Sequence, residues 1–166
     1  MRLASLYSLP ILHLDNVHWY DDWAERQWDE ENWIVRTFMQ ANEGGWIIDG
    51  DYFSVASERF GLSELTVLLD YGRWWCWWSC FKRWREWRGR SRGNCPCIEK
   101  FDFAFQKWIL WDSRGKDIEY THKRIMENGR GLKLRFKSRK ELMVWLERLE
   151  KRKAAADEDA NKKVVV

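Results

Sequence analysis

Short apolar runs that alternate with amphipathic stretches set the pattern of this chain. Three runs of four to six residues cover 11–15, 46–50 and 65–70, and each contains or ends in an aspartate. Such runs, separated by helical stretches, are typical of parallel strands buried on both faces of a sheet. A fourth run over 132–136 alternates apolar and basic residues, which predicts a strand nearer an edge of the sheet.

Helical patterns fill the intervals between these runs. Apolar residues at helical spacing predict helices over 24–42, 73–87, about 101–127 and 139–151. A loop rich in Gly, Arg and Ser is expected over 88–96. The alternation predicts an α/β fold, with one domain over residues 1–150 and a charged, disordered tail over 151–166.

Charge and cysteine usage narrow the classes of function. The chain has 29 Lys and Arg against 26 Asp and Glu, and a net charge of +3 is too even to predict a nucleic-acid or membrane partner. Pro10, His13 and Asp15 interrupt the apolar start that a signal peptide would need. The four cysteines are too few and too clustered for a secreted disulfide scaffold. We therefore expect a soluble cytoplasmic protein.

Tryptophan is the unusual feature of the composition. The chain has 14 tryptophans, and each carries an N–H group that needs a partner when buried, so they cannot all fit in one small core. We expect some of them to line a cleft, a partner surface or a mobile cover.

Acidic residues follow three of the predicted strands, at Asp15, Asp49 and Asp70. Ligands of open α/β sheets bind beyond the carboxyl ends of the strands, so each aspartate is a candidate binding residue. The alternative is that each acid only caps the next helix or turn. Asp15 and Asp49 are the stronger candidates, because polar and aromatic residues follow both of them: His18 and Trp19 after the first, Gly50, Asp51 and Tyr52 after the second.

Basic residues gather in and before the predicted loop. Five arginines fall within ten residues, at Arg83, Arg85, Arg88, Arg90 and Arg92. Guanidinium groups suit bidentate contacts with phosphate and the charge of a transferring phosphoryl group. The alternatives are a solvated charged loop, or a surface where bases stack on the interleaved Trp84 and Trp87. The even net charge disfavours nucleic acid.

The cysteines allow a four-thiolate zinc site in principle, through Cys76, Cys80, Cys95 and Cys97. Their spacing is not a usual zinc spacing, so free thiols are the simpler interpretation.

The order of several segments resembles a known family. LPILHLDNVHW over 9–19, WIIDGDY over 46–52 and LLD over 68–70 with Arg73 resemble the adenylate-kinase-like P-loop proteins called DNA topology modulation proteins. CIEKFD over 97–102 is similar to the family's Cys-Pro-Glu-Lys-Phe-Asp stretch, with Ile98 in place of proline. The resemblance covers about residues 3–150.

This resemblance implies a fold and an activity. The fold would be a three-layer sandwich around a mainly parallel sheet, with an Arg-rich lid at about 83–97. The activity would be ATP-dependent phosphoryl transfer to a small acceptor, with ATP and magnesium as cofactors. The implied roles are magnesium binding and catalysis for Asp49, phosphate contacts for Arg83, Arg88, Arg90 and Arg92, and acceptor binding for Asp15, His18, Trp19, Tyr52 and Arg73.

One defining part of the family is missing. No G-x-x-x-x-G-K-[ST] motif occurs in the chain, and Met1 falls inside the helix that follows this motif in the family. The missing first strand would be central, between the strands at 46–49 and 65–69. We favour the interpretation that the given start is truncated, so that the chain by itself is inactive.

Three alternatives remain. The strands at 46–49 and 65–69 would close the gap and leave an inactive binding domain, or the product would not fold stably. Outside the family resemblance, residues 73–92 would form a Trp/Arg-rich module that binds nucleic acid or protein.

Overall fold

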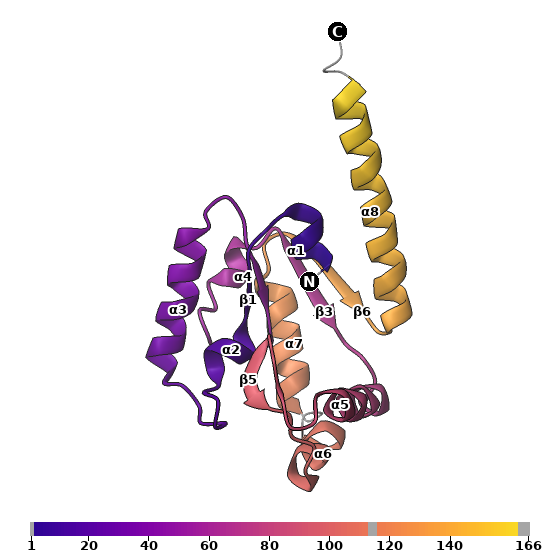
Figure 1. The fold of residues 1–166 in the computed structure, drawn as a ribbon. Helices are drawn as coiled ribbons and strands as arrows, with labels where there is room; N and C mark the ends of the chain where they lie inside the picture. The colour runs from indigo at the N-terminus through magenta and orange to yellow at the C-terminus, as the bar shows by residue number, and fades with distance from the viewer. Residues whose placement is uncertain (1, 113–115, 163–166) are drawn as a thin grey trace.

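The computed structural model describes residues 2–112 and 116–162, which form a mixed α/β chain (Figure 1). The helices are α1 (Arg2–Tyr7), α2 (Leu14–His18), α3 (Trp28–Ala41), α4 (Arg59–Leu62), α5 (Arg73–Trp87), α6 (Phe103–Leu110), α7 (Lys116–Asn128) and α8 (Arg139–Lys162). The strands are β1 (Ile11–His13), β2 (Ile47–Asp49), β3 (Leu65–Leu69), β4 (Ser91–Arg92), β5 (Cys95–Ile98) and β6 (Leu132–Phe136).

The strands form two parallel pairs and one antiparallel hairpin. β1 pairs with β2 from Ile11↔Ile47 to His13↔Asp49, and β3 pairs with β6 in parallel over five residue pairs. β4 and β5 form the hairpin, which begins inside the loop predicted over 88–96 and ends beyond it, at Ile98. Among the described strands, β2 pairs only with β1 and β3 only with β6. The alternative in which β2 and β3 close the gap is therefore wrong, and the parallel strands form two pairs rather than one continuous sheet.

The main core lies around the first strand pair. Leu14 and Val17 of α2 and Val35 and Met39 of α3 are buried together with Val55 and Ala56 of the loop after β2. The spacing of Val35 and Met39 places both on one face of α3. Trp28, the first residue of the helix, is more than half exposed.

Several element boundaries differ from the prediction. The run after β1 turns into the short helix α2 at Leu14, so Asp15 lies in a helix rather than at the last residue of a strand. The helix predicted over 101–127 is two helices, α6 and α7, on either side of residues outside the described part. Asp102 begins α6 by accepting a hydrogen bond from the Phe105 amide at 2.8 Å.

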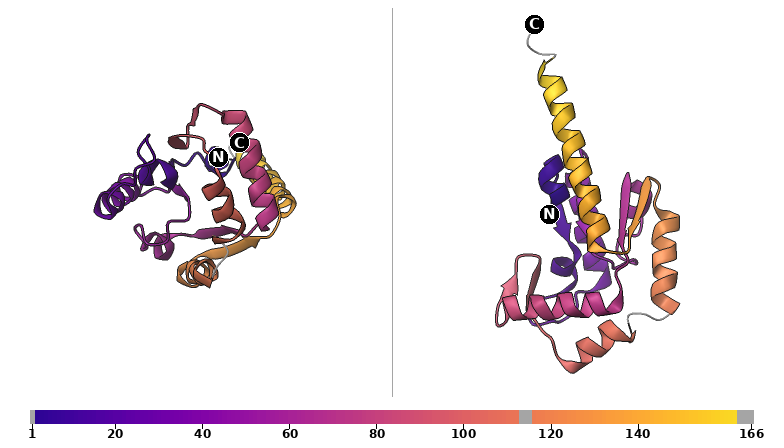
Figure 2. Two further views of the ribbon diagram at one scale, coloured as in Figure 1. Left: turned by 90° about the horizontal axis from the view of Figure 1, so that it is seen from below. Right: turned by 90° about the vertical axis from the view of Figure 1, so that its right-hand side faces the viewer.

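The last helix is longer than the sequence pattern predicted. The predicted end was near Lys151, whereas α8 continues to Lys162, so residues 152–162 of the expected tail are helical. Three alanines at 154–156 favour helix, and Lys153 pairs with Asp157 one turn later at 3.3 Å. Figure 2 shows this half of α8 standing away from the other elements. Within 2–112 and 116–162, none of the helices combines the length and apolar character needed to cross a membrane.

Candidate functional site

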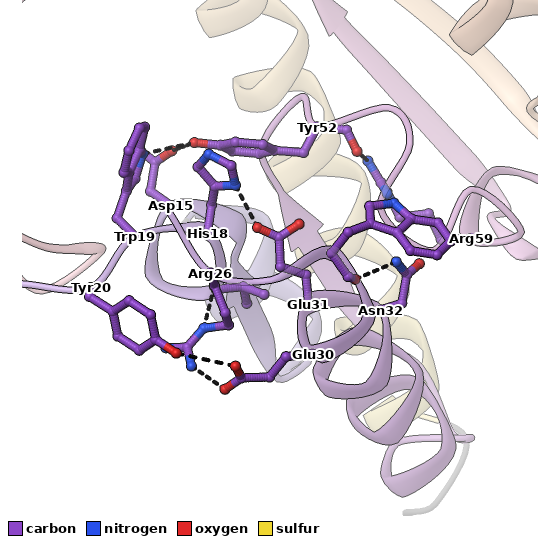
Figure 3. Close-up of polar contacts among 12 residues, drawn as sticks. Asp15, His18, Trp19, Tyr20, Arg26, Glu30, Glu31, Asn32, Tyr52 and Arg59 are labelled. Atoms are coloured by element: carbon purple, nitrogen blue, oxygen red, sulfur yellow. Dashed lines mark hydrogen bonds and ion pairs between the residues drawn. The ribbon is translucent and has the colours of Figure 1, made fainter. Parts of the chain in front are cut away.

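Four of the predicted acceptor-binding residues lie together where the chain leaves β1 and β2 (Figure 3). The Tyr52 hydroxyl donates to Asp15 Oδ1 at 3.0 Å, and Trp19 Nε1 donates to the same hydroxyl at 3.1 Å. The His18 ring packs between its neighbours, with centroids 4.5 Å from Trp19 and 4.4 Å from Tyr52. Because β1 and β2 are parallel, their following segments meet at one edge. We call Asp15, His18, Trp19 and Tyr52 the acceptor cluster.

The proton of Tyr52 is held firmly in this cluster. Burial, together with the nearby charge and hydrogen bond of Asp15, raises the pKa of Tyr52 well above its usual value. Tyr52 therefore stays a hydroxyl donor at any physiological pH. Its backbone has φ 25°, in the left-handed region that a bulky residue rarely adopts, so the surrounding loop must hold it there.

Arg59 holds the loop that carries Tyr52. Its guanidinium is buried and donates to the backbone carbonyls of Asp51 at 2.7 Å, Tyr52 at 3.1 Å and Val55. Burial lowers the pKa of Arg59 to about 10, and the nearby charges of Asp51 and Glu58 oppose that shift. This residue could not be found from the sequence, because nothing in the local pattern marks an arginine that turns inward to bind three carbonyls.

Glu31 orients His18. The carboxylate of Glu31 is buried on α3, and its Oε1 lies 2.6 Å from His18 Nδ1. A carboxylate accepts hydrogen bonds, so this contact places a hydrogen on Nδ1 and leaves Nε2 on the opposite side of the ring. Glu31 was also missed by sequence reasoning, since it lies among the ordinary acidic residues of a helix N-terminus.

Asp49 is the ion-pair partner of His13. Its Oδ2 is 2.9 Å from His13 Nδ1, and its side chain is 62% exposed. In the described part of the chain, no three His, Cys, Asp or Glu side chains are grouped so that they could hold a metal ion. The protein side chains around Asp49 therefore do not form a metal centre by themselves.

The predicted phosphate-binding arginines fall into two groups. Arg83 and Arg92 both form ion pairs with the buried carboxylate of Glu99, the first at 3.0 Å. Arg88 and Arg90 are exposed and stack on rings of their own segment, 5.2 Å from Trp84 and 5.7 Å from Trp87. Arg73 is exposed at the first residue of α5.

The β4–β5 hairpin is fastened to the segment that carries the acceptor cluster. Asn16 Nδ2 donates to the Gly93 carbonyl at 3.1 Å, and Trp23 Nε1 donates to the Ile98 carbonyl at 3.0 Å. The Cys97 thiol donates to the Tyr20 carbonyl at 2.9 Å. Burial and the neighbouring Cys95 raise the pKa of Cys97 to about 11. None of the four cysteines forms a disulfide, and within the described residues they do not belong to a group of three side chains that could hold a metal ion.

Asp70, the third candidate carboxylate, has a structural role. It accepts hydrogen bonds from Arg135 Nε at 3.0 Å and Nη2 at 2.6 Å, which join the end of β3 to β6. Asp70 does not cap the next helix, as the alternative interpretation predicted, because the N-cap of α5 is Gly72.

ATP and magnesium do not fit the residues described. The chain has no glycine-rich phosphate loop or its lysine, and two of the four candidate phosphate-binding arginines are held by Glu99.

No protein-family model, curated protein or solved structure matches this chain.

Proposed function

We propose that this chain carries the acceptor site of a phosphotransferase of the P-loop kinase type. On this proposal it binds a small acceptor with a planar ring and a hydroxyl group, such as a nucleoside, and does not bind ATP·Mg by itself. The observation that carries the proposal is the acceptor cluster, in which four residues from two strand ends meet.

The chemistry of the cluster favours such an acceptor. Asp15 has one oxygen that receives the Tyr52 hydroxyl, and its carboxylate accepts further hydrogen bonds from a hydroxyl group. The rings of Trp19 and Tyr52 are half-buried, so they offer faces on which a planar ring can stack. His18, oriented by Glu31, supplies a ring nitrogen that can take the proton of a reacting hydroxyl.

Arginines at the base of the hairpin would bind a phosphate group of the acceptor. It is attached to α2 through Asn16, and Arg88 and Arg90 stand exposed at its base. Guanidinium groups there suit the 5′-phosphate of a nucleoside monophosphate. A monophosphate should then bind more tightly than the corresponding nucleoside, and high salt should remove the difference.

Calorimetric titration tests this function. Adenosine, guanosine, cytidine, thymidine and their 5′-monophosphates are titrated into the 166-residue chain, and ATP·Mg is titrated separately. We expect at least one nucleoside to bind and ATP·Mg not to bind. Asp15→Asn should weaken binding about tenfold or more, since it removes a charge-assisted hydrogen bond.

Asp157→Asn is the matched control, because Asp157 is exposed on the distal half of α8. It should leave the affinity unchanged. Binding that is equally weak for all of these ligands, or that is unaffected by Asp15→Asn, would refute the proposal.

A further inference from the structure

Helix α5 carries an exposed row of aromatic and cationic side chains. Trp74, Trp75 and Trp78 are 67%, 46% and 42% exposed, and Lys82 and Arg85 continue the row toward the hairpin. Positions 74, 78, 82 and 85 follow helical spacing, so they share one side of α5. No residue of this 15-residue helix is buried. We call these five residues the outer face of α5.

The other side of α5 is fixed by ring packing. Trp77, Phe81 and Trp84 each contact Phe101, with centroids 5.6 to 6.0 Å apart. Trp77 Nε1 also donates to Gln106 Oε1 of α6 at 3.3 Å. These contacts fix the orientation of α5, so its outer face points away from Phe101 and α6.

Charge is concentrated on this segment. Residues 73–92 contain seven of the 29 basic and one of the 26 acidic residues, so the segment carries +6 and the rest of the chain −3. Glu99 pairs with Arg83 and Arg92 only. The other five cations of the segment are exposed, and none forms an ion pair with a described residue: Arg73, Lys82, Arg85, Arg88 and Arg90. The net charge of +3, which disfavoured nucleic acid, is the sum of a strongly basic segment and a weakly acidic remainder.

The cations and the rings alternate closely enough to act together. Lys82 lies 5.5 Å from the Trp78 ring centroid, and Arg88 and Arg90 lie at similar distances from Trp84 and Trp87. Proteins that bind single-stranded nucleic acid combine the same two parts: cations along the phosphates and rings on which bases stack.

We infer that the outer face of α5 binds single-stranded nucleic acid, with bases stacked on Trp74 and Trp78 and phosphates on the neighbouring cations. A membrane surface fits less well, because an interfacial helix needs an apolar side along its whole length. On α5 the exposed rings occupy only the amino-terminal half, and Lys82 and Arg85 follow on the same side.

Fluorescence anisotropy with labelled oligo(dT) and oligo(U) of about 16 nucleotides tests the inference. We expect both to bind at low salt, and their ratio tells whether DNA or RNA is preferred. Release of counterions from up to five phosphates gives a slope of log K against log salt no steeper than about −3.5. Trp74→Ala and Trp78→Ala should each weaken binding between about 5- and 150-fold. Trp74→Phe should retain most of the affinity, because it keeps a ring.

Trp33→Ala is the matched control. Trp33 is 66% exposed, as Trp74 is, but it lies on α3, whose first turn is acidic. This variant should bind the oligonucleotides as the unchanged chain does. Thermal unfolding of each variant shows whether the fold is kept, and nucleoside binding at the acceptor cluster should be unaffected by changes on α5.

Three outcomes would overturn the inference. The first is no binding of either oligonucleotide at low salt. The second is binding that Trp74→Ala and Trp78→Ala do not weaken, which would show a purely electrostatic contact with any polyanion. The third is partition onto phosphatidylcholine–phosphatidylglycerol vesicles, with no oligonucleotide binding, which would identify the outer face as a membrane contact.

Discussion

The Tyr52 hydroxyl links the segments that follow β1 and β2. It donates to Asp15 and accepts from Trp19, and both partners belong to the segment after β1. Since its pKa is raised, this pair of bonds is present throughout the physiological pH range. The cluster therefore depends on the hydroxyl, while the ring alone provides the packing against His18.

Tyr52→Phe separates these two contributions. The ring remains, but Asp15 loses a donor and the Trp19 N–H loses its acceptor. We expect the free energy of unfolding to fall by about 1–2 kcal/mol, and the nucleoside affinity to fall with it. Urea denaturation measures the first quantity. Tyr120→Phe, at an exposed position on α7, is the control and should change stability by less than about 0.5 kcal/mol. Equal effects of the two substitutions would contradict the role given to the hydroxyl.

At this scale the sequence predicts the members of the cluster but not the residues that hold them. Asp15, His18, Trp19 and Tyr52 could be predicted together because each follows the end of a recognisable parallel strand. Glu31 could not, because it lies 13 residues after His18 on another helix and only packing brings the two together. Arg59 lies near its partners in the sequence, but the local pattern does not show that its side chain turns inward. The pairing of Arg83 and Arg92 with Glu99 could not be predicted either, because Glu99 lies in a different segment of the chain.

Among the elements, the β4–β5 hairpin is held to α5 by one buried acid. Glu99 directly follows β5, its side chain is 3% exposed, and it receives Arg83 from α5 and Arg92 from β4. Glu99 thus neutralises the charges of Arg83 and Arg92, which the sequence suggested were available to contact phosphate. It also gives the hairpin a fixed position, since three segments meet at one carboxylate.

Glu99→Gln should loosen this junction. The substitution keeps the shape but leaves two guanidinium groups without a counter-charge, and Arg92 is mostly buried. We expect a loss of about 3 kcal/mol in the free energy of unfolding, the lower end of the range for broken buried pairs, because Arg83 is one-third exposed. Urea denaturation provides the measurement.

Glu58→Gln is the control for that change. Glu58 pairs with Arg36 at the surface, where both side chains are largely exposed, so its loss should cost less than about 1 kcal/mol. If the two substitutions cost the same, Glu99 does not fasten the hairpin.

Some elements follow closely from the sequence and others do not. Strand β6 and helix α5 have the predicted bounds. Gly131 directly precedes β6 and Gly72 directly precedes α5, and the apolar pattern of each element stops at its last residue. Helix α2 was missed because it has five residues and begins directly after a strand. The hairpin was missed because its strands are short and are held by contacts with α2 and α5 rather than by an apolar pattern.

In the whole molecule, the two parallel pairs divide the chain into two halves. The first pair carries α2, α3 and the acceptor cluster, and the second carries α7 and α8. The family resemblance placed a further strand between β2 and β3, and no described residue takes that position. The described strands therefore do not form the continuous sheet that the resemblance implies.

The inner edges of β2 and β3 allow a direct test of this division. The Ile47 amide donates to the Pro10 carbonyl and the Asp70 amide to the Phe136 carbonyl, both at 2.9 Å. Amide directions alternate along a strand, so the amides of Ile48 and Leu69 point to the opposite edges, where the described chain offers no paired strand.

Hydrogen exchange followed by NMR should therefore find fast exchange at Ile48 and Leu69 and slow exchange at Ile47 and Asp70. Each neighbour is the control for the other, because the two amides of a pair are adjacent in the chain and share one local stability. Strong protection at Ile48 and Leu69 would mean that another segment pairs with these edges in solution. Protection that disappears on dilution would identify that segment as part of a second copy, and protection that persists would contradict two separate strand pairs within one chain.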